Sequence, residues 1–284
     1  MQIIETVSEL LTMVENAKQK GLKIGLVPTM GALHAGHMSL VKRSLQDNDI
    51  TIVSLFVNPT QFNNPTDLAT YPRQPEKDFR LLAKEGVDVA FAPTVEEIYP
   101  EGFDKNRKFE LGKVAEVMEG KYRPGHFQGV ALIVNRLFKL CRPDKAYFGM
   151  KDFQQIAVIR QMVKSEGINV DIIACPIVRE DTGLALSSRN QLLSETQKEE
   201  AAFIHKTLKE SLKYSLNNGV EETRKMVISS LDGKEDFEVE YFEIVDGETL
   251  LPVEEWNEAA YVVGCITVFV GKVRLIDNIE YRPL

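Results

Sequence analysis

The sequence predicts an α/β fold in which a mostly parallel sheet carries helices on both faces, followed by a smaller α+β domain at the C-terminus. Apolar strand-like segments alternate with helix-like segments as far as about residue 178. After residue 179 the order changes to two helices followed by strands. The chain has 284 residues, 44% of them hydrophobic, which is enough for one large domain or two modest ones.

The first domain is expected to cover residues 1–178. Its first helix spans residues 6–20, because Thr6 and Glu9 have capping-box spacing, an apolar stripe follows, and Gly21 can end the helix. Residues 51–57 are a continuous apolar run, typical of a strand buried on both faces. The further helices are expected from segment 28–37 to about residue 46 and at 75–84, 128–140 and 152–165, with further strands at 23–27, 87–92, 145–148 and 170–175.

The second domain is expected to cover residues 179–284. A polar segment at 179–190 joins it to the first. An amphipathic helix at 195–216 and a helix at 221–231 come next, before a strand at 237–245 and a β-rich run at 260–275. Helices followed by antiparallel strands are typical of an α+β domain.

Composition excludes several classes of protein. A net charge of −8 argues against nucleic-acid or membrane binding, which depends on excess lysine and arginine, but leaves room for a nucleotide substrate. Cys141, Cys175 and Cys265 lie far apart in apolar runs, so we expect buried thiols rather than a zinc site or disulfides. No apolar segment approaches the roughly 20 residues of a membrane span, and the first residues lack signal-peptide features, so a cytoplasmic location is expected.

The segment PTMGALHAGH at 28–37 is the most informative part of the chain. It places His34 and His37 three residues apart, just after an apolar run. If a helix begins here, both imidazoles project from one face of its first turns, beside unpaired N–H groups and the positive end of the helix dipole. Gly31 and Gly36 would let a bulky anion approach the backbone. Spacing alone leaves a phosphate site, an ordinary core helix and half of a metal site open.

Two further segments follow predicted strands. In NPTQF at 58–62, Gln61 can donate to and accept from a small ligand, although the same residues also make an ordinary turn. In GMKDFQQ at 149–155, Lys151 suits phosphate, and Gln155 lies on the same helix face as Asp152. Asp152 is either a helix N-cap or a partner for a ribose hydroxyl or a metal-bound water.

The segment SSR at 187–189 lies in the joining segment and offers hydroxyls, a guanidinium and N–H groups to an anion, where a solvated loop is the alternative. His126 in RPGHF at 123–127 lies in a turn and is a candidate ligand contact. Because parallel sheets bind ligands at the carboxyl ends of their strands, we expect these segments to share one site with two phosphate-binding loops and neutral amides. Neither G-x-S-x-G nor G-x-G-x-x-G is present, so a hydrolase triad and a dinucleotide fold are poorly supported.

Together these segments resemble the pantoate–β-alanine ligase family. The matching segments are PTMGALHAGH at 28–37, FVNPTQF at 56–62, YPR at 71–73, HFQGV at 126–130, GMKDFQQ at 149–155 and LSSRN at 186–190. Met150 departs from the glutamate more usual in the family, but its neighbours are kept and we expect activity to be kept as well. The resemblance implies a Rossmann-like member of the nucleotidylyltransferase superfamily, which includes class I aminoacyl-tRNA synthetases.

The reaction implied by the resemblance is ATP-dependent condensation of (R)-pantoate with β-alanine through a pantoyl adenylate, releasing AMP and pyrophosphate. The family is typically a magnesium-dependent cytoplasmic homodimer. The catalytic residues implied are His34, His37 and Lys151, with His37 as proton donor. The residues implied to bind ATP are Met30, Gly31, Leu33, His34, Gly36, His37, Gly149, Lys151, Asp152, Val178, Leu186, Ser187, Ser188 and Arg189. Those implied to bind the other substrates are Gln61, Gln155, Asn58, Met30 and His126.

The sequence identifies no magnesium ligands. Because an adenylate hydrolyses readily in water, the second domain is expected to act as a lid, with residues 179–190 as its hinge. Two alternatives stay open. One is another adenylate-forming or nucleotidyl-transferring enzyme of the same superfamily, and the other is an inactive nucleotide-binding protein.

Overall fold

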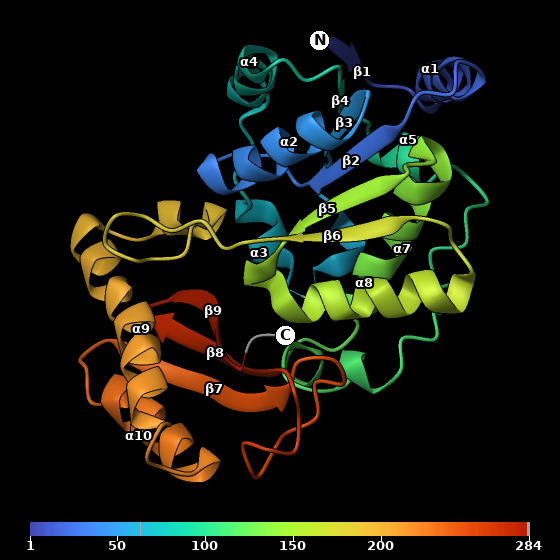
Figure 1. Cartoon of the computed structure of the whole chain (residues 1–284). Coiled ribbons are helices and arrows are strands. Elements are labelled where there is room, and N and C mark those ends of the chain that lie inside the picture. The colour runs from blue at the N-terminus through green and yellow to red at the C-terminus, as the bar shows by residue number, and fades with distance from the viewer. Residues whose placement is uncertain (63, 283–284) are drawn as a thin grey trace.

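The computed structural model describes residues 1–62 and 64–282, and these form two sheets (Figure 1). The larger sheet has six parallel strands in the order β1-β4-β3-β2-β5-β6. Its strands are β1 (Gln2–Ile4), β2 (Ile24–Thr29), β3 (Ile50–Leu55), β4 (Val89–Phe91), β5 (Lys145–Gly149) and β6 (Asp171–Cys175). The five predicted strands are confirmed. Strand β1 is an addition, because its three residues are too few to show a strand pattern.

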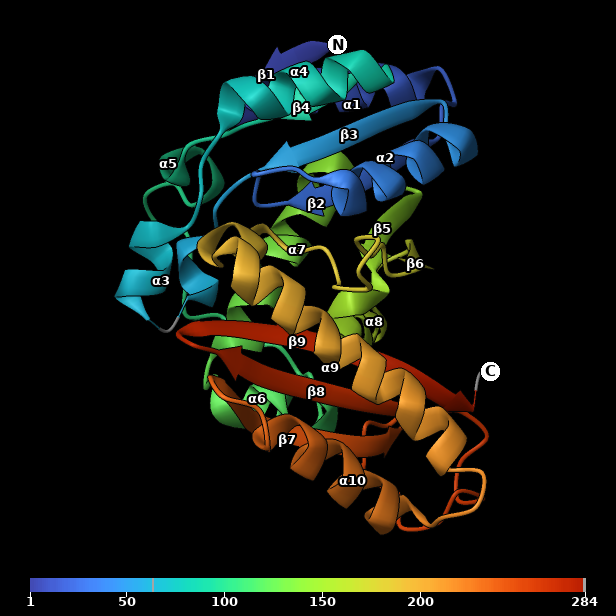
Figure 2. The same cartoon turned by 90° about the vertical axis from the view of Figure 1, so that its left-hand side faces the viewer.

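Helices cover both faces of this sheet, as predicted (Figures 1 and 2). The helices on one face are α1 (Val7–Gln19), α7 (His126–Cys141) and α8 (Phe153–Glu166). The opposite face packs against α2 (Ala35–Asp47) and α4 (Pro75–Glu85). Three short helices lie in the connections: α3 (Pro65–Thr70), α5 (Val95–Ile98) and α6 (Glu119–Tyr122). Sequence patterns did not predict these, since four to six residues show no helical period.

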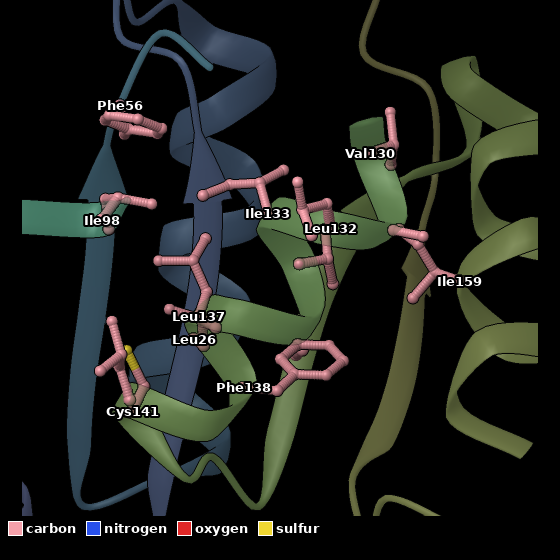
Figure 3. Close-up of a cluster of buried hydrophobic side chains, with 14 of the residues drawn as sticks. Leu26, Phe56, Ile98, Val130, Leu132, Ile133, Leu137, Phe138, Cys141 and Ile159 are labelled. Carbon is pink, nitrogen blue, oxygen red and sulfur yellow. The ribbon is translucent and has the colours of Figure 1, made fainter. Parts of the chain in front are cut away.

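The main core surrounds α7, whose side chains point toward β2 on one side and α8 on the other (Figure 3). Leu137 and Phe138 are 2% and 3% exposed and pack in one cluster with Leu26 and Ile159. Truncating such a leucine to alanine typically costs about 2–5 kcal/mol. Helix α7 therefore holds a fixed position beneath the sheet, and it begins at His126, two residues before the predicted start.

The smaller sheet has three antiparallel strands in the order β7-β8-β9. Its strands are β7 (Phe237–Asp246), β8 (Val262–Val270) and β9 (Val273–Arg282), and its helices are α9 (Glu195–Tyr214) and α10 (Val220–Asp232). The predicted run at 260–275 is thus a hairpin of two strands. One face of the sheet packs on α9 and α10, and the other contacts α8 and the segment around Met118 (Figure 2). A domain boundary near residue 178 stays a prediction.

The topology brings the sequence motifs together. Strands β3, β2, β5 and β6 are neighbours in the parallel sheet, and four of the motifs follow their carboxyl ends, whereas RPGHF at 123–127 lies at the start of α7. The sheet reverses its winding between β2 and β5, which is where open α/β sheets bind ligands. All three cysteines are buried and unpaired, as expected. In the described part of the chain, no helix is both long and apolar enough to cross a bilayer.

Candidate active site

A cavity of about 220 Å³ lies at the carboxyl ends of these four strands. Most of the residues singled out in the sequence line it. They are Met30, His34, Gly36, His37, Asn58, Gln61, Gly149, Lys151, Asp152, Gln155, Val178, Leu186, Ser187, Ser188 and Arg189. Gly31, Leu33 and His126 are not among its lining residues.

The two histidines use their rings to organise the start of α2. His34 is the N-cap residue, and its Nδ1 accepts a hydrogen bond from the Gly36 N–H at 3.2 Å. The Nδ1 of His37 accepts from the His34 N–H at 3.4 Å. Two N–H groups that were expected to be free for an anion, those of His34 and Gly36, are therefore used by the rings. Because both Nδ1 atoms accept, each neutral ring carries its proton on Nε2, the atom left to donate to a ligand.

Burial keeps both imidazoles uncharged. It lowers the pKa of His34 to about 4, with a contribution from the Lys151 charge. It lowers the pKa of His37 to about 3, and His34 and Lys151 add to that effect. The ring centroids lie 4.1 Å apart, so protonating one ring opposes protonation of the other. A Cβ at position 36 would lie 2.9 Å from the Nδ1 of His34, so any other residue there would displace this ring.

A buried carboxylate fixes the loop before the histidines. Asp78 on α4 is 2% exposed and accepts from the N–H groups of Ala32 at 2.9 Å and Leu33 at 2.8 Å. Ala32 has φ +50°, a left-handed conformation that a non-glycine residue adopts at a cost. The N–H of Gly31 donates to Thr29. The N–H groups of Gly31 and Leu33, predicted to bind ATP, are thus already paired within the protein.

The loop after β5 presents the cation. Met150–Asp152 form a short 3-10 helix before α8, and the Nζ of Lys151 lies 3.6 Å from the Asp152 carboxylate. Asp152 occupies the N-cap position of α8, but its side chain makes no capping hydrogen bond. The N-cap alternative for this carboxylate is therefore wrong. Asn278 on β9 donates from its amide to the carbonyls of Met150 at 2.8 Å and Lys151 at 3.1 Å, which fixes the loop from the smaller sheet.

Two neutral amides, Gln61 and Gln155, also line the cavity. The Nε2 of Gln61 lies 3.3 Å from the sulfur of Met30, and its Oε1 accepts from Asn58 at 3.0 Å. Asn58 is 1% exposed, and its Oδ1 accepts from the Tyr99 hydroxyl. Its amide is therefore bonded within the protein and holds the Gln61 side chain in place. Gln155 lines the cavity from the first turn of α8.

The loop from Ser187 to Arg189 completes the cavity. Ser187 caps a short 3-10 helix (Ser188–Leu192), and the hydroxyl of Ser188 donates to the Ala32 carbonyl at 3.3 Å. The Arg189 guanidinium donates to Asp67 on α3 at 3.0 Å. Both side chains of that ion pair are about one-third exposed, so the pair is worth only about 0–1 kcal/mol and an incoming anion can displace it.

Sequence reasoning did not identify the apolar wall of the cavity. Val130, Ile133, Val134 and Leu137 project into it from α7, and Tyr71 lines it from the segment after α3. The unbroken apolar character of α7 was visible in the sequence, but it equally suits a core helix. Within the described residues, no group of three His, Cys, Asp or Glu side chains could hold a metal ion.

The fold and the cavity fit an α/β enzyme for a phosphate-bearing ligand, because neutral ring donors, two cations, amides and an apolar wall line one cavity at the ends of parallel strands. Comparison with known proteins gives the particular family. A profile described as pantoate-beta-alanine ligase matches residues 2–280. Pantothenate synthetase from Bacteroides thetaiotaomicron is 52% identical over 284 residues and covers all of both chains. That from Porphyromonas gingivalis is 52% identical over 282 residues, covering 99% of this chain and 100% of the relative.

Solved structures agree. A crystal structure of pantothenate synthetase from Thermus thermophilus matches with a TM-score of 0.92 and 42% identity over the whole of both chains. The pantoate-beta-alanine ligase from Francisella tularensis, solved with beta-gamma ATP and beta-alanine, has a TM-score of 0.82 and 39% identity, covering 99% of this chain and 98% of that one. The chain belongs to the pantoate–β-alanine ligase family. It is a ligase that produces pantothenate.

Proposed function

We propose that this cavity joins (R)-pantoate to β-alanine through a pantoyl adenylate. The pantoate carboxylate attacks the α-phosphorus of ATP and pyrophosphate leaves. The amine of β-alanine then attacks the acyl carbon, loses a proton, and AMP leaves. The observation that carries this proposal is that one cavity is lined by Lys151, Arg189 and two imidazoles together with the neutral amides of Gln61 and Gln155. The Francisella relative, solved with an ATP analogue and beta-alanine, supports the choice of co-substrates.

The ATP side of the proposal uses the groups that stabilise negative charge. Lys151, Ser187, Ser188 and Arg189 hold the β- and γ-phosphates, while Gly149, Asp152 and Val178 hold the nucleoside. His34 and His37 meet the α-phosphate, where charge builds up during adenylation. Since burial lowers the pKa of His37 to about 3, it meets ATP as a neutral Nε2–H hydrogen-bond donor rather than as an acid.

The acyl side uses neutral groups. Gln61 and Gln155 hold pantoate, Gln61 also serves β-alanine, and Met30 packs between pantoate and ATP. A lysine in their place would pair with the carboxylate that must react, whereas an amide orients it without neutralising it. The two methyl groups of pantoate suit the wall formed by Val130, Ile133 and Val134.

Magnesium fits this cavity as part of the ATP complex. Asp152 is the one carboxylate among the described residues that line the cavity, and Lys151 lies 3.6 Å from it. Mg²⁺ is typically held by substrate phosphates and water with one or two carboxylates. Asp152 would contact a water of the Mg²⁺ shell, and the ion would supply charge to balance the phosphates.

A homodimer working in the cytoplasm, with the segment that carries Ser187–Arg189 at the start of the second domain as its lid, completes the proposal. Light scattering tests the dimer directly, and a mass of one chain at micromolar concentration would contradict it. The reaction is tested by pyrophosphate exchange into ATP, which should require pantoate but not β-alanine. AMP formation should require both acids. Exchange that depends on a different carboxylate or on a phosphate ester would move the assignment to another member of the superfamily.

A further inference from the structure

One buried carboxylate of the first part of the chain binds all three strands of the smaller sheet. Glu119 on α6 is 7% exposed. Its carboxylate accepts from Arg274 on β9 at 2.6 and 2.8 Å, from Tyr241 on β7 at 2.9 Å and from Thr267 on β8 at 3.1 Å. Burial alone opposes the charge, but the Arg274 guanidinium outweighs it and lowers the pKa of Glu119 to about 2. Glu119 is thus ionised at working pH and fully bonded.

The same carboxylate is linked to the substrate side of the cavity. Arg123 donates to Glu119 at 3.3 Å and contacts the Nε2 of His126 at 3.2 Å. Arginine can only donate, so this Nε2 accepts and the neutral His126 carries its proton on Nδ1. That Nδ1 lies 2.9 Å from the Gln61 carbonyl, to which it donates. Burial and the Arg123 charge lower the pKa of His126 to about 4, which keeps this tautomer in place at neutral pH.

The turn that carries Gln61 rests on the first turns of α7. A Cβ at Gly129 would lie 2.2 Å from the Thr60 carbonyl oxygen, so the two backbones touch at this point. Asn58 donates both to the Gly129 carbonyl at 3.1 Å and to the Gln61 side chain at 3.0 Å. The Gln61 carbonyl is also bonded to His126 at the start of α7. A small rotation of α7 would therefore move the Gln61 amide.

We propose that His126 and Glu119 are positioning residues for the acyl substrate. His126 fixes the backbone of Gln61, and Glu119 holds Arg123 so that His126 keeps the required tautomer and orientation. This inference rests on the proposed contact between Gln61 and pantoate. Neither residue lines the main cavity, and both line a smaller cavity beside it that shares Lys151 and Asp152, so the proposal gives them no direct contact with the substrate. A cluster that served stability alone would change the unfolding temperature without changing the affinity for one particular substrate.

Two substitutions of His126 separate its two contacts. In His126→Asn the side-chain amide nitrogen takes the place of Nδ1 and can still donate to the Gln61 carbonyl. In His126→Gln the amide reaches the Nε2 position and loses that donor. We expect the KM for pantoate to stay within about threefold of wild type in His126→Asn and to rise about tenfold in His126→Gln, the effect of one lost hydrogen bond. The KM for ATP should be unchanged in both.

Glu119→Gln should also raise the KM for pantoate, while Glu240→Gln serves as its control. Glu240 pairs with the same Arg274 but makes no contact with Arg123, so its variant should lower stability only. Equal KM values for pantoate in the two His126 variants would overturn the proposal, whether or not Glu119→Gln folds. If wild-type exchange shows no dependence on pantoate, the proposed function fails instead. If the wild-type exchange does depend on pantoate but the two His126 variants have the same KM for pantoate, only the positioning role is refuted.

Discussion

Replacing Asp78 tests whether the histidine loop depends on one buried carboxylate. Asp78 accepts both backbone N–H groups of Ala32 and Leu33, at 2.9 and 2.8 Å, and holds Ala32 at φ +50°. In Asp78→Ala these two N–H groups lose their acceptor beneath the loop, and the strained conformation loses its main constraint. In Asp78→Asn the amide oxygen still accepts one of them.

The structure sets the size of the effect. A hydrogen bond to a charged group contributes about 1.5–3 kcal/mol, and a buried donor left unpaired costs a similar amount. Burial of the Asp78 carboxylate, which raises its pKa, offsets part of this gain. We therefore expect Asp78→Ala to lower the free energy of unfolding by about 2–4 kcal/mol and Asp78→Asn by about half as much. A displaced His34 should also reduce kcat/KM for ATP by about 10- to 100-fold.

Urea denaturation and pantoate-dependent AMP formation measure the two effects. Glu76→Ala is the matched control, because Glu76 lies in the same first turn of α4, meets the same helix dipole, and is exposed. It should change stability by less than about 0.5 kcal/mol and leave the KM for ATP unaltered. Asp78→Ala behaving like Glu76→Ala in both assays would refute the reasoning.

Three more outcomes follow from the site. Lys151→Met should lower kcat/KM for ATP by about 10²–10⁴-fold at unchanged unfolding temperature, and a loss below about threefold would contradict its role at the phosphates. Asn278→Ala removes the hydrogen bonds to the carbonyls of Met150 and Lys151. The KM for ATP should therefore rise several-fold while the KM for pantoate stays constant. A rise in the KM for pantoate alone would contradict this prediction. His34 and His126 have pKa values lowered to about 4, so the unfolded chain binds more protons below pH 6.5. The free energy of unfolding should therefore decrease as the pH falls from 6.5 to 4. A urea midpoint that stays constant over that range would contradict this prediction.

The sequence predicted those parts of the site that depend on local order. The motifs that carry Gln61, Lys151 and Ser188 follow strands of the parallel sheet. Because parallel strands present their carboxyl ends at one edge, these residues could be assigned to one cavity before its geometry was known. The predicted cap of α1 is confirmed, since the Thr6 hydroxyl accepts from the Glu9 N–H at 3.3 Å.

The other parts depend on contacts between segments far apart in the chain. Asp78 is 46 residues from Ala32, and Asn278 is 128 residues from Met150. Nothing in the local pattern distinguishes Asp78 from the exposed Glu76 two residues earlier. His126 was predicted to contact substrate from its turn and its family motif, and that contact stays a prediction, whereas the hydrogen bond from its Nδ1 to the Gln61 carbonyl was not predicted. Its role becomes visible only when the turn and α7 are packed together.

The contacts of β9 also restrict how the site can close. This strand holds the Lys151 loop through Asn278 and the Glu119 cluster through Arg274, so it supports both the ATP side and the acyl side of the cavity. A rigid movement of the whole smaller sheet would break the buried Glu119–Arg274 pair, at about 3–5 kcal/mol. Releasing the partly exposed Arg189 from Asp67 costs only about 0–1 kcal/mol. Closure should therefore involve the segment that carries Ser187–Arg189 moving onto the phosphates, with β7–β9 staying in place. This can be checked by solving structures with and without an adenylate analogue. A shift of β7–β9 as one body against α6 would show that breaking the Glu119–Arg274 pair costs less than this comparison requires.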